Sequence, residues 1–405
     1  SNSYSVTKQT NDFGYPIVKA TSDSALIALD YVKQYSNITF KSYDDPARIV
    51  ITSKWDEIDS ATVSKSTQVR VKGGIKSPIL KEVKKDDKIT ILDSGDKWDK
   101  VATEDGVIGY IKRKALSESK KTKLTNPDYE EETFTHIKKD KDICLAWNQV
   151  TSQSANNKVP QVISSTKGIN VMSPTWFYLN DNNGNLADIA SKDYVSYCHS
   201  QGIEVWGLFS NFENTDVDAA YVLTHTSTRT TLINQIMSAA FNYELDGVNI
   251  DFENITEAAY GDSYIEFIRE LAIKCHNNGI SLSVDVTVPA SFNKFFNRSD
   301  MANFADYIVI MGYDEHYAGS SEAGSVASLS WVTQGVSDTL KEVPADQIIL
   351  GMPFYTRVWK ISSDNSSDDT AAGAKIPSKI YGMKAANDFL ATHLSLIHIS
   401  EPTRH

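Results

Sequence analysis

The sequence predicts an α/β protein whose larger part is a (β/α)8 barrel, and three observations support this prediction. From about residue 137 onward, strand-like segments alternate with helical patterns, as they do in parallel sheets. One of these segments, residues 246–253 (DGVNIDFE), is apolar on one face and polar on the other. Seven strand segments can be counted, whereas a closed barrel of this type has eight.

The first third of the chain predicts two smaller domains. Residues 1–58 predict a small α+β module, which includes a strand at residues 47–55 that is rich in β-forming residues. Residues 60–117 contain short strands separated by turns with Gly and Asp, and this spacing favours a small β-barrel. Residues 118–136 are polar and lack apolar periodicity, so we predict a linker there.

The predicted barrel covers residues 137–393. Its strand candidates are residues 143–147, 168–173, 204–209, 247–253, 281–287, 307–311 and 347–352. Helical patterns at residues 227–244 and 262–278 flank the fourth strand, and Gly279 is a C-terminal cap of the second helix. We therefore expect a TIM barrel that is truncated before its eighth strand. Active sites of such barrels lie at the carboxyl ends of the strands.

The fourth strand carries the candidate chemistry. Asn249, Asp251 and Glu253 stand at alternate positions, so on a strand they leave the same face about 6.6–6.8 Å apart. The alternative is an antiparallel strand with a solvated outer face. The helices on both sides favour a parallel strand that is covered on both faces, where a buried carboxylate is costly unless it has a function.

Composition excludes several classes of function. The formal net charge is −12, which disfavours nucleic acid as a partner because phosphate binding needs clustered Lys and Arg. Three scattered cysteines form neither a disulfide framework nor a metal site, and no Gly-rich phosphate loop is present, so we expect no cofactor and no metal. The chain starts at Ser1 without Met, and we expect an upstream signal or anchor and an extracellular or cell-surface location.

The C-terminal residues are unusual. Residues 394–404 (LSLIHISEPTR) resemble the translation of an adapter used in sequencing libraries. We therefore expect residues 394–405 to be an artefactual tail, with an ordinary amphipathic tail as the alternative. The barrel would then be incomplete, with exposed sheet edges on its first and seventh strands. We accordingly expect the chain as written to be unstable or inactive.

Three motifs in order resemble glycoside hydrolase family 18, the chitinase-like family. The DGVNIDFE segment is similar to the family's D-G-x-D-x-D-x-E, with Asn249 where many members have Asp. Residues 311–314 (MGYD) and 350–355 (LGMPFY) resemble the family's sixth and seventh strands. The resemblance is greatest to bacterial spore-cortex and cell-wall N-acetylglucosaminidases. Residues 96–111 resemble bacterial Src-homology-3-like domains, for which wall binding and a spacer role both stay open.

The resemblance implies the roles of the site residues. Glu253 would be the general acid and then the base, and Asp251 would orient the substrate's acetamido group, whose oxygen is the nucleophile. Tyr313 would complete the catalytic set by a hydrogen bond to that group. The predicted substrate-binding residues are Asp246, Asn249, Met311, Asp314, Trp147 and Tyr355. We hypothesise that burial and the negative charge of Asp251 keep Glu253 protonated.

The resemblance thus implies retaining hydrolysis of β-1,4 linkages after N-acetylglucosamine. Peptidoglycan is the first expected substrate and chitin the second, and we expect a monomer associated with the cell wall. The alternative is a non-hydrolytic, lectin-like protein that binds these polymers, although the presence of Glu253, Asp251 and Tyr313 favours an enzyme. A purely structural wall anchor would leave the acidic strand unexplained.

Overall fold

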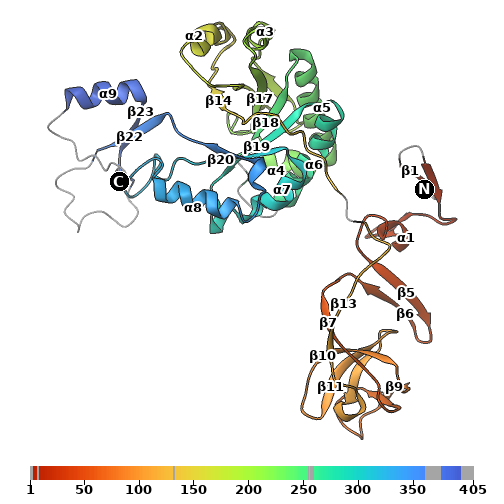
Figure 1. Cartoon of the computed structure of the whole chain (residues 1–405). Coiled ribbons are helices and arrows are strands. Elements are labelled where there is room, and N and C mark those ends of the chain that lie inside the picture. The colour runs from red at the N-terminus through yellow and green to blue at the C-terminus, as the bar shows by residue number, and fades with distance from the viewer. Residues whose placement is uncertain are drawn as a thin grey trace. The chain divides into compact units, whose positions relative to one another are not determined.

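The computed structural model describes residues 3–6, 9–130, 133–253, 255, 260–360 and 375–393. It divides the chain into two compact units, Ser1–Thr133 and Phe134–His405. The predicted tail at residues 394–405 lies outside the described residues. Figure 1 shows the helices and strands of both units.

The first unit begins with hairpins and one short helix. The hairpins are β1 (Ser3–Val6) with β2 (Gln9–Asp12), β3 (Val18–Ala20) with β4 (Ala25–Ile27), and β5 (Thr39–Asp44) with β6 (Ala47–Thr52), and the helix is α1 (Leu29–Val32). The strand expected at residues 47–55 is therefore present as β6. An ion pair of 2.6 Å between Arg48 and Asp105 joins this hairpin to the sheet that follows.

An antiparallel sheet completes the first unit. Its strands lie in the order β13 (Lys120–Lys123), β7 (Glu57–Thr62), β10 (Lys88–Asp93), β11 (Trp98–Thr103), β12 (Ile108–Lys112), β8 (Thr67–Arg70) and β9 (Ile79–Val83), and the short 3₁₀ helix η1 (Arg113–Ala115) follows β12. Its core contains Val63, Val69 and Val101, which are fully buried. Residues 120–123, predicted as linker, form β13 instead, because pairing with β7 uses backbone groups and requires no apolar pattern.

The second unit is built on a parallel sheet whose described strands follow the chain order. They are β14 (Leu145–Asn148), β15 (Val171–Leu179), β17 (Glu204–Ser210), β18 (Gly247–Asp251), β19 (Ser281–Thr287), β20 (Tyr307–Met311) and β21 (Ile348–Gly351), with β16 (Leu186–Asp188) antiparallel to β15. Each of the seven predicted strands is present. The second unit thus has an α/β fold with a curled parallel sheet.

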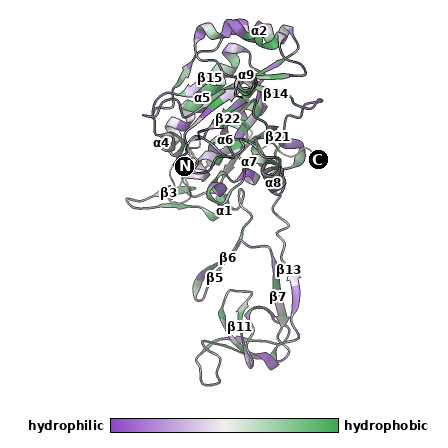
Figure 2. Cartoon of the chain, turned by 90° about the vertical axis from the view of Figure 1, so that its left-hand side faces the viewer, coloured by the Kyte–Doolittle hydropathy of each residue, from purple (hydrophilic) through white to green (hydrophobic). Residues whose placement is uncertain are grey.

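Helices follow most of these strands. They are α2 (Val159–Ser164), α3 (Lys192–Ser200), α4 (Ala219–Thr224), α5 (Thr226–Tyr243), α6 (Gly261–Asn277), α7 (Arg298–Phe304) and α8 (Leu329–Thr339), with 3₁₀ helices η2 (Gln153–Lys158), η4 (Ser291–Phe296) and η5 (Ala345–Gln347). The hydrophobic core contains Val248 and Ile250 from the outward face of β18, and Phe252, which follows the strand. Hydrophobic residues accordingly gather along the strands in Figure 2.

A hairpin and a helix follow the last parallel strand. The hairpin pairs β22 (Tyr355–Trp359) with β23 (Ser378–Gly382), and the helix is α9 (Met383–Thr392). The hairpin contacts the loop after β20, because Trp359 Nε1 donates to the Gly324 carbonyl at 2.9 Å and Ile376 N donates to the Ser320 carbonyl at 3.1 Å. This loop includes Tyr313 and Asp314, so the hairpin supports part of the candidate site.

Two glycines allow close approaches within the sheet. A Cβ on Gly247 would lie 2.6 Å from the Trp206 ring, which explains the Gly that opens β18. A Cβ on Gly351 would lie 2.7 Å from Cη2 of Trp147, so the indole of β14 rests against β21. In the described part of the chain, β14 and β21 are not paired by backbone hydrogen bonds, and the Trp147 ring of β14 contacts Gly351 of β21.

Candidate active site

The site begins at the carboxyl end of β18. Asn249 is fully buried and Asp251 is 9% exposed, whereas Glu253, two residues beyond Asp251, is exposed. The alternation of the strand places all three on the inward side of the sheet, because Val248, Ile250 and Phe252 are in the core. The predicted acidic face is therefore buried at its base and open to solvent at its end.

Hydrogen bonds from three strands fix the amide of Asn249. Its Oδ1 accepts from Trp147 Nε1 at 3.1 Å and from Ser173 Oγ at 2.9 Å. Its Nδ2 donates to Asp285 Oδ1 at 2.7 Å. The indole of Trp147 also donates to Asp285 Oδ2 at 3.1 Å. Asn249 is thus the centre of a buried polar network that ends on a carboxylate.

Asp285 is a member of the site that sequence reasoning missed. It is 2% exposed and lies on β19, next to β18 in the sheet. Ser281, Ser283 and Asp285 alternate with apolar residues, and all three are buried. This alternation is the same signal that identified the acidic face of β18, and a carboxylate at its carboxyl end would have predicted Asp285.

The carboxyl group of Asp251 is held in an unusual state. Its Oδ1 is buried and has no hydrogen-bond partner in the described part of the structure. Its pKa is raised well above the usual range, chiefly by burial and then by the charges of Asp285, Glu253 and Glu213. A buried oxygen without a partner is costly, and in a cleft it is an acceptor available to a ligand N–H.

The pKa of Glu253 is also raised. Desolvation by surrounding protein is the main cause, and the charges of Asp314 and Glu213 add to it. The hypothesis that burial raises this pKa agrees with the structure, and the predicted charge interaction between Glu253 and Asp251 is present as an increase in the pKa of Asp251. Glu213 was not foreseen; it follows β17, and its Oε1 accepts from Ser210 Oγ at 2.6 Å. A carboxyl group that is accessible and retains its proton can act as a general acid.

Aromatic side chains line one side of these acids. The ring of Tyr313 lies edge-on to Trp147 and to Tyr355, with 6.2 Å between the ring centroids in each pair. The hydroxyl of Tyr355 donates to Asp314 Oδ1 at 2.8 Å. Burial and the nearby acids, Asp285 first among them, raise the pKa of Tyr313, so its hydroxyl stays a hydrogen-bond donor. The structure thus brings four predicted residues, Trp147, Tyr313, Asp314 and Tyr355, together with the acids.

Two other predicted residues lie deeper or farther away. Met311 ends β20, is 8% exposed and pairs with Thr287 and Gly351 in the sheet. Asp246 precedes β18, so it lies at the opposite end of a five-residue strand from Asp251, roughly 16 Å away. The prediction that Asp246 binds substrate is therefore wrong. Its Oδ2 instead accepts from His199 Nε2 and from Val205 N, each at 2.8 Å.

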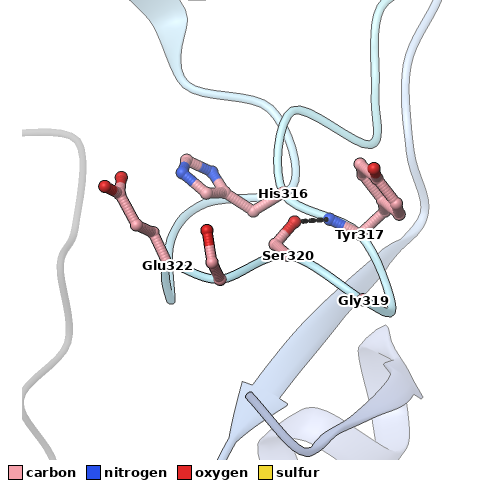
Figure 3. A pocket seen from close by; sticks show the side chains of 6 residues that line it. His316, Tyr317, Gly319, Ser320 and Glu322 are labelled. Atoms are coloured by element: carbon pink, nitrogen blue, oxygen red, sulfur yellow. Dashed lines mark hydrogen bonds between the residues drawn. The ribbon is translucent and has the colours of Figure 1, made fainter. Parts of the chain in front are cut away.

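A hollow lies in the loop after β20 (Figure 3). It is lined by His316, Tyr317, Gly319, Ser320, Ser321 and Glu322. Ser320 Oγ accepts from Tyr317 N at 3.0 Å, and His316 Nδ1 lies 2.9 Å from the Ser325 carbonyl. A Cβ on Gly324 would come within 2.4 Å of the His316 ring, so this histidine packs against its own loop.

The geometry limits what the site can do. Among the described residues no group of His, Cys, Asp and Glu is arranged to hold a metal ion, and no described helix is long and apolar enough to cross a membrane. The cleft combines an accessible carboxyl group of raised pKa, a buried carboxyl oxygen without a partner and an aromatic wall. These groups suit proton transfer to a ligand that presents an N–H group and an apolar face.

Comparison with known proteins gives the family context. Residues 209–395 match the model of a family described as glycosyl hydrolases family 18. The uncharacterized glycosylase YvbX of Bacillus subtilis is 24% identical over 248 residues, which make up 56% of this chain and 71% of that protein. The matched region spans about a third or less of the length of the other curated relatives.

Solved structures share the fold. A chitinase from Chromobacterium violaceum has a TM-score of 0.52 at 20% identity, covering 62% of this chain and 76% of that chain. The spore cortex-lytic enzyme SleL of Bacillus megaterium has a TM-score of 0.51 at 16% identity, covering 67% of this chain and 60% of that chain. At these identities the likeness establishes the α/β fold alone.

Proposed function

We propose that the protein is a glycoside hydrolase of family 18, whose model residues 209–395 match, and that it hydrolyses β-1,4 linkages after N-acetylglucosamine with retention of configuration. The observation that carries the proposal is the pairing of two carboxyl groups with different environments. Glu253 is accessible and has a raised pKa, whereas Asp251 presents a buried oxygen without a partner. We also propose that the sheet belongs to a (β/α)8 barrel.

The position of the two acids supports a substrate-assisted mechanism. An ordinary retaining glycosidase places two carboxyl groups about 5–5.5 Å apart on opposite sides of the scissile bond. Asp251 and Glu253 stand at alternate positions of one segment and therefore approach the substrate from the same side. The nucleophile must come from elsewhere, and the substrate's 2-acetamido oxygen can supply it.

Each residue then has a distinct task. Glu253 protonates the glycosidic oxygen as the bond breaks and later removes a proton from the attacking water. Asp251 Oδ1 accepts the acetamido N–H and faces the positive charge that develops on the ring formed by the acetamido group. Tyr313 donates its hydroxyl hydrogen to the same group, and the Trp147 ring is the surface against which the sugar stacks.

Peptidoglycan is the proposed substrate and chitin is the second candidate. Relatives in fold are named a spore cortex-lytic enzyme and a chitinase, which is consistent with either polymer. The antiparallel sheet of the first unit, with its resemblance to Src-homology-3-like domains, supports a role at the cell wall. We also propose that the protein is extracellular or located at the cell surface, and that it is a monomer.

The decisive test compares polymers that differ only in the acetamido group. The natural protein is incubated with peptidoglycan, chitin and a chitin from which the acetyl groups have been removed, and released reducing ends are measured. We expect cleavage of an acetylated polymer, retention at the anomeric carbon by NMR, and no cleavage of the deacetylated one. Equal cleavage with and without acetyl groups would contradict the mechanism.

The lectin-like alternative has its own outcome in the same experiment. Binding of peptidoglycan or chitin without release of reducing ends, equal in the natural chain and in Glu253→Gln, would support a sugar-binding protein. We expect instead that Glu253→Gln binds the polymer as the natural chain does but releases reducing ends far more slowly. The variant thus separates recognition from hydrolysis.

A further inference from the structure

The sheet register brings a second acid beside Asp251. Asn249 pairs with Ser283 and Ile250 pairs with Val284 across β18 and β19. The next residues along the two parallel strands are Asp251 and Asp285, and neighbouring strands lie about 4.8 Å apart. Both side chains face inward, and they are 9% and 2% exposed. Two carboxyl groups therefore lie next to each other below the cleft.

Two adjacent buried carboxyl groups cannot both be ionised without a large cost. The other titratable groups that face Asp251 are the acids Glu253 and Glu213. Asp285 faces Glu253, and the hydroxyls of Tyr313 and Tyr264 are influenced by both aspartates. None of these groups supplies a positive charge, so the pair must keep a proton.

The hydrogen bonds distinguish the two aspartates. Each oxygen of Asp285 accepts an N–H group, from Asn249 at 2.7 Å and from Trp147 at 3.1 Å. Such bonds stabilise an ionised carboxylate. Asp251 Oδ1 has no partner among the described residues. In the empty site the negative charge therefore belongs on Asp285 and the proton on Asp251.

We propose that Asp285 holds the proton of Asp251 during the reaction and so replaces a second acid within β18. This inference rests on the proposed function. When the charged intermediate forms, the O–H bond of Asp251 breaks and a new O–H bond forms on Asp285, so that Asp251 carries the negative charge beside the cation. The pair has a net charge of −1 before and after, and the reverse transfer restores the empty site.

Asn249 has a positioning role in this scheme. An amide takes up no proton at neutral pH, so Asn249 itself cannot be the acceptor. Its oxygen is fixed by Trp147 and Ser173, which directs its Nδ2 toward Asp285. Asp285 therefore acts through Asp251 as a positioning residue and does not contact the substrate.

The proton can be observed without turnover. Infrared spectroscopy of the full chain at neutral pH detects the C=O stretch of a protonated carboxyl group, and exchange into D2O shifts this band. We expect one buried protonated carboxyl signal that is lost in Asp251→Asn. In Asp285→Asn its frequency should shift, because burial keeps Asp251 protonated while the neighbouring carboxylate is removed. Glu253→Gln should keep this signal. An unchanged band frequency in Asp285→Asn, folded by circular dichroism, or a signal that persists in Asp251→Asn would overturn the proposal.

A charge-swap variant tests the role in catalysis. We expect Asp285→Asn to lower kcat about 10²-fold with a changed pH–rate profile and a KM within about threefold. The double variant Asn249→Asp/Asp285→Asn places the acid on β18. Its kcat should be at least about tenfold higher than that of Asp285→Asn. An unchanged pH–rate profile in Asp285→Asn would show a merely structural residue. If the natural chain cleaves no polymer, the proposed function fails while the infrared result still decides the proton's position.

Discussion

The two ends of β18 carry acids with opposite surroundings. At the amino end, Asp246 accepts hydrogen bonds from His199 and from the backbone of Val205, so its carboxylate joins α3 and β17 to the strand. At the carboxyl end, Asp251 is more deeply buried and keeps an oxygen without a partner in the described structure. The two acids are five residues apart, and their sequence context alone does not distinguish their roles.

At the amino end, the hydrogen bonds of Asp246 hold neighbouring elements together, whereas at the carboxyl end the unpartnered oxygen of Asp251 is available to a ligand. A fold gains nothing by burying a carboxyl oxygen without a donor, because the group loses its water without replacement. At Asp251 that cost is tolerated where a ligand can supply the donor.

Substitution of Glu253, just beyond the carboxyl end of β18, should have the greatest effect on activity. Glu253→Gln removes the proton donor while keeping the shape of the side chain, so we expect kcat to fall about 10²- to 10⁴-fold. Release of reducing ends measures this. Glu244→Gln, an exposed change near the amino end of β18, is the matched control and should leave kcat unchanged. Equal losses in both variants would remove the distinction between the two ends.

The buried pair at the carboxyl end should make stability depend on pH. The pKa values of Asp251 and Asp285 are both raised, so above about pH 4 the folded chain binds more protons than the unfolded chain. Their contribution is complete below the unfolded pKa and is lost as the pH rises through the folded-state value. We expect the free energy of unfolding to decrease by up to about 1.4 kcal/mol per pH unit.

Urea unfolding at a series of pH values measures this slope, and Asp285→Asn should make it shallower. The matched control is Asp246→Asn, for which we expect the slope of the natural chain, because Asp246 is outside the buried pair. The same slope in Asp285→Asn and the natural chain would show that the pair holds no extra proton.

Removal of the Tyr313 hydroxyl tests the role of the aromatic side chains beside the acids. Tyr313→Phe keeps the ring between Trp147 and Tyr355 but loses the proposed hydrogen bond to the acetamido group. A single hydrogen bond of this kind contributes about 1 kcal/mol, so we expect kcat/KM to fall about fivefold to tenfold. The thermal midpoint should not change. An unaltered kcat/KM would place the hydroxyl outside the binding site.

The smallest effect on activity is expected at the amino end. Asp246→Ala leaves the backbone N–H of Val205 and the ring of His199 without their acceptor, which should cost about 1–2 kcal/mol of stability. We expect kcat of the folded variant to stay within about twofold of the natural value. Denaturant unfolding and steady-state rates measure the two quantities. A large loss of kcat at full folding would return Asp246 to the catalytic site.

Much of the site could be predicted from the sequence because its strongest signals are local. The alternation along residues 246–253 and the MGYD motif each occupy one strand end, so the register and the inward face followed from neighbouring residues. Asp285 was missed because its importance depends on Asn249, 36 residues earlier, and becomes visible once β18 and β19 are paired.

The other differences also arise from contacts between distant segments. The misassignment of Asp246 followed from treating the whole DGVNIDFE segment as one functional unit, although a strand of five residues has two ends in different surroundings. β13 was missed because an edge strand is stabilised by backbone pairing with β7 rather than by its own pattern. Tertiary pairing decides both cases, and it is not encoded in a local window.

The contact between Trp147 and Gly351 has a consequence for how the acids are controlled. The indole N–H reaches Asn249 and Asp285 only because β21 offers a residue without a side chain at the point where the ring rests. Adding a single methyl group there would displace the ring and withdraw a hydrogen bond from Asp285. A position that has neither charge nor polar side chain thus sets the acidity of a carboxyl group two strands away. The space left by Gly351 thus helps to determine how readily Asp285 takes up a proton.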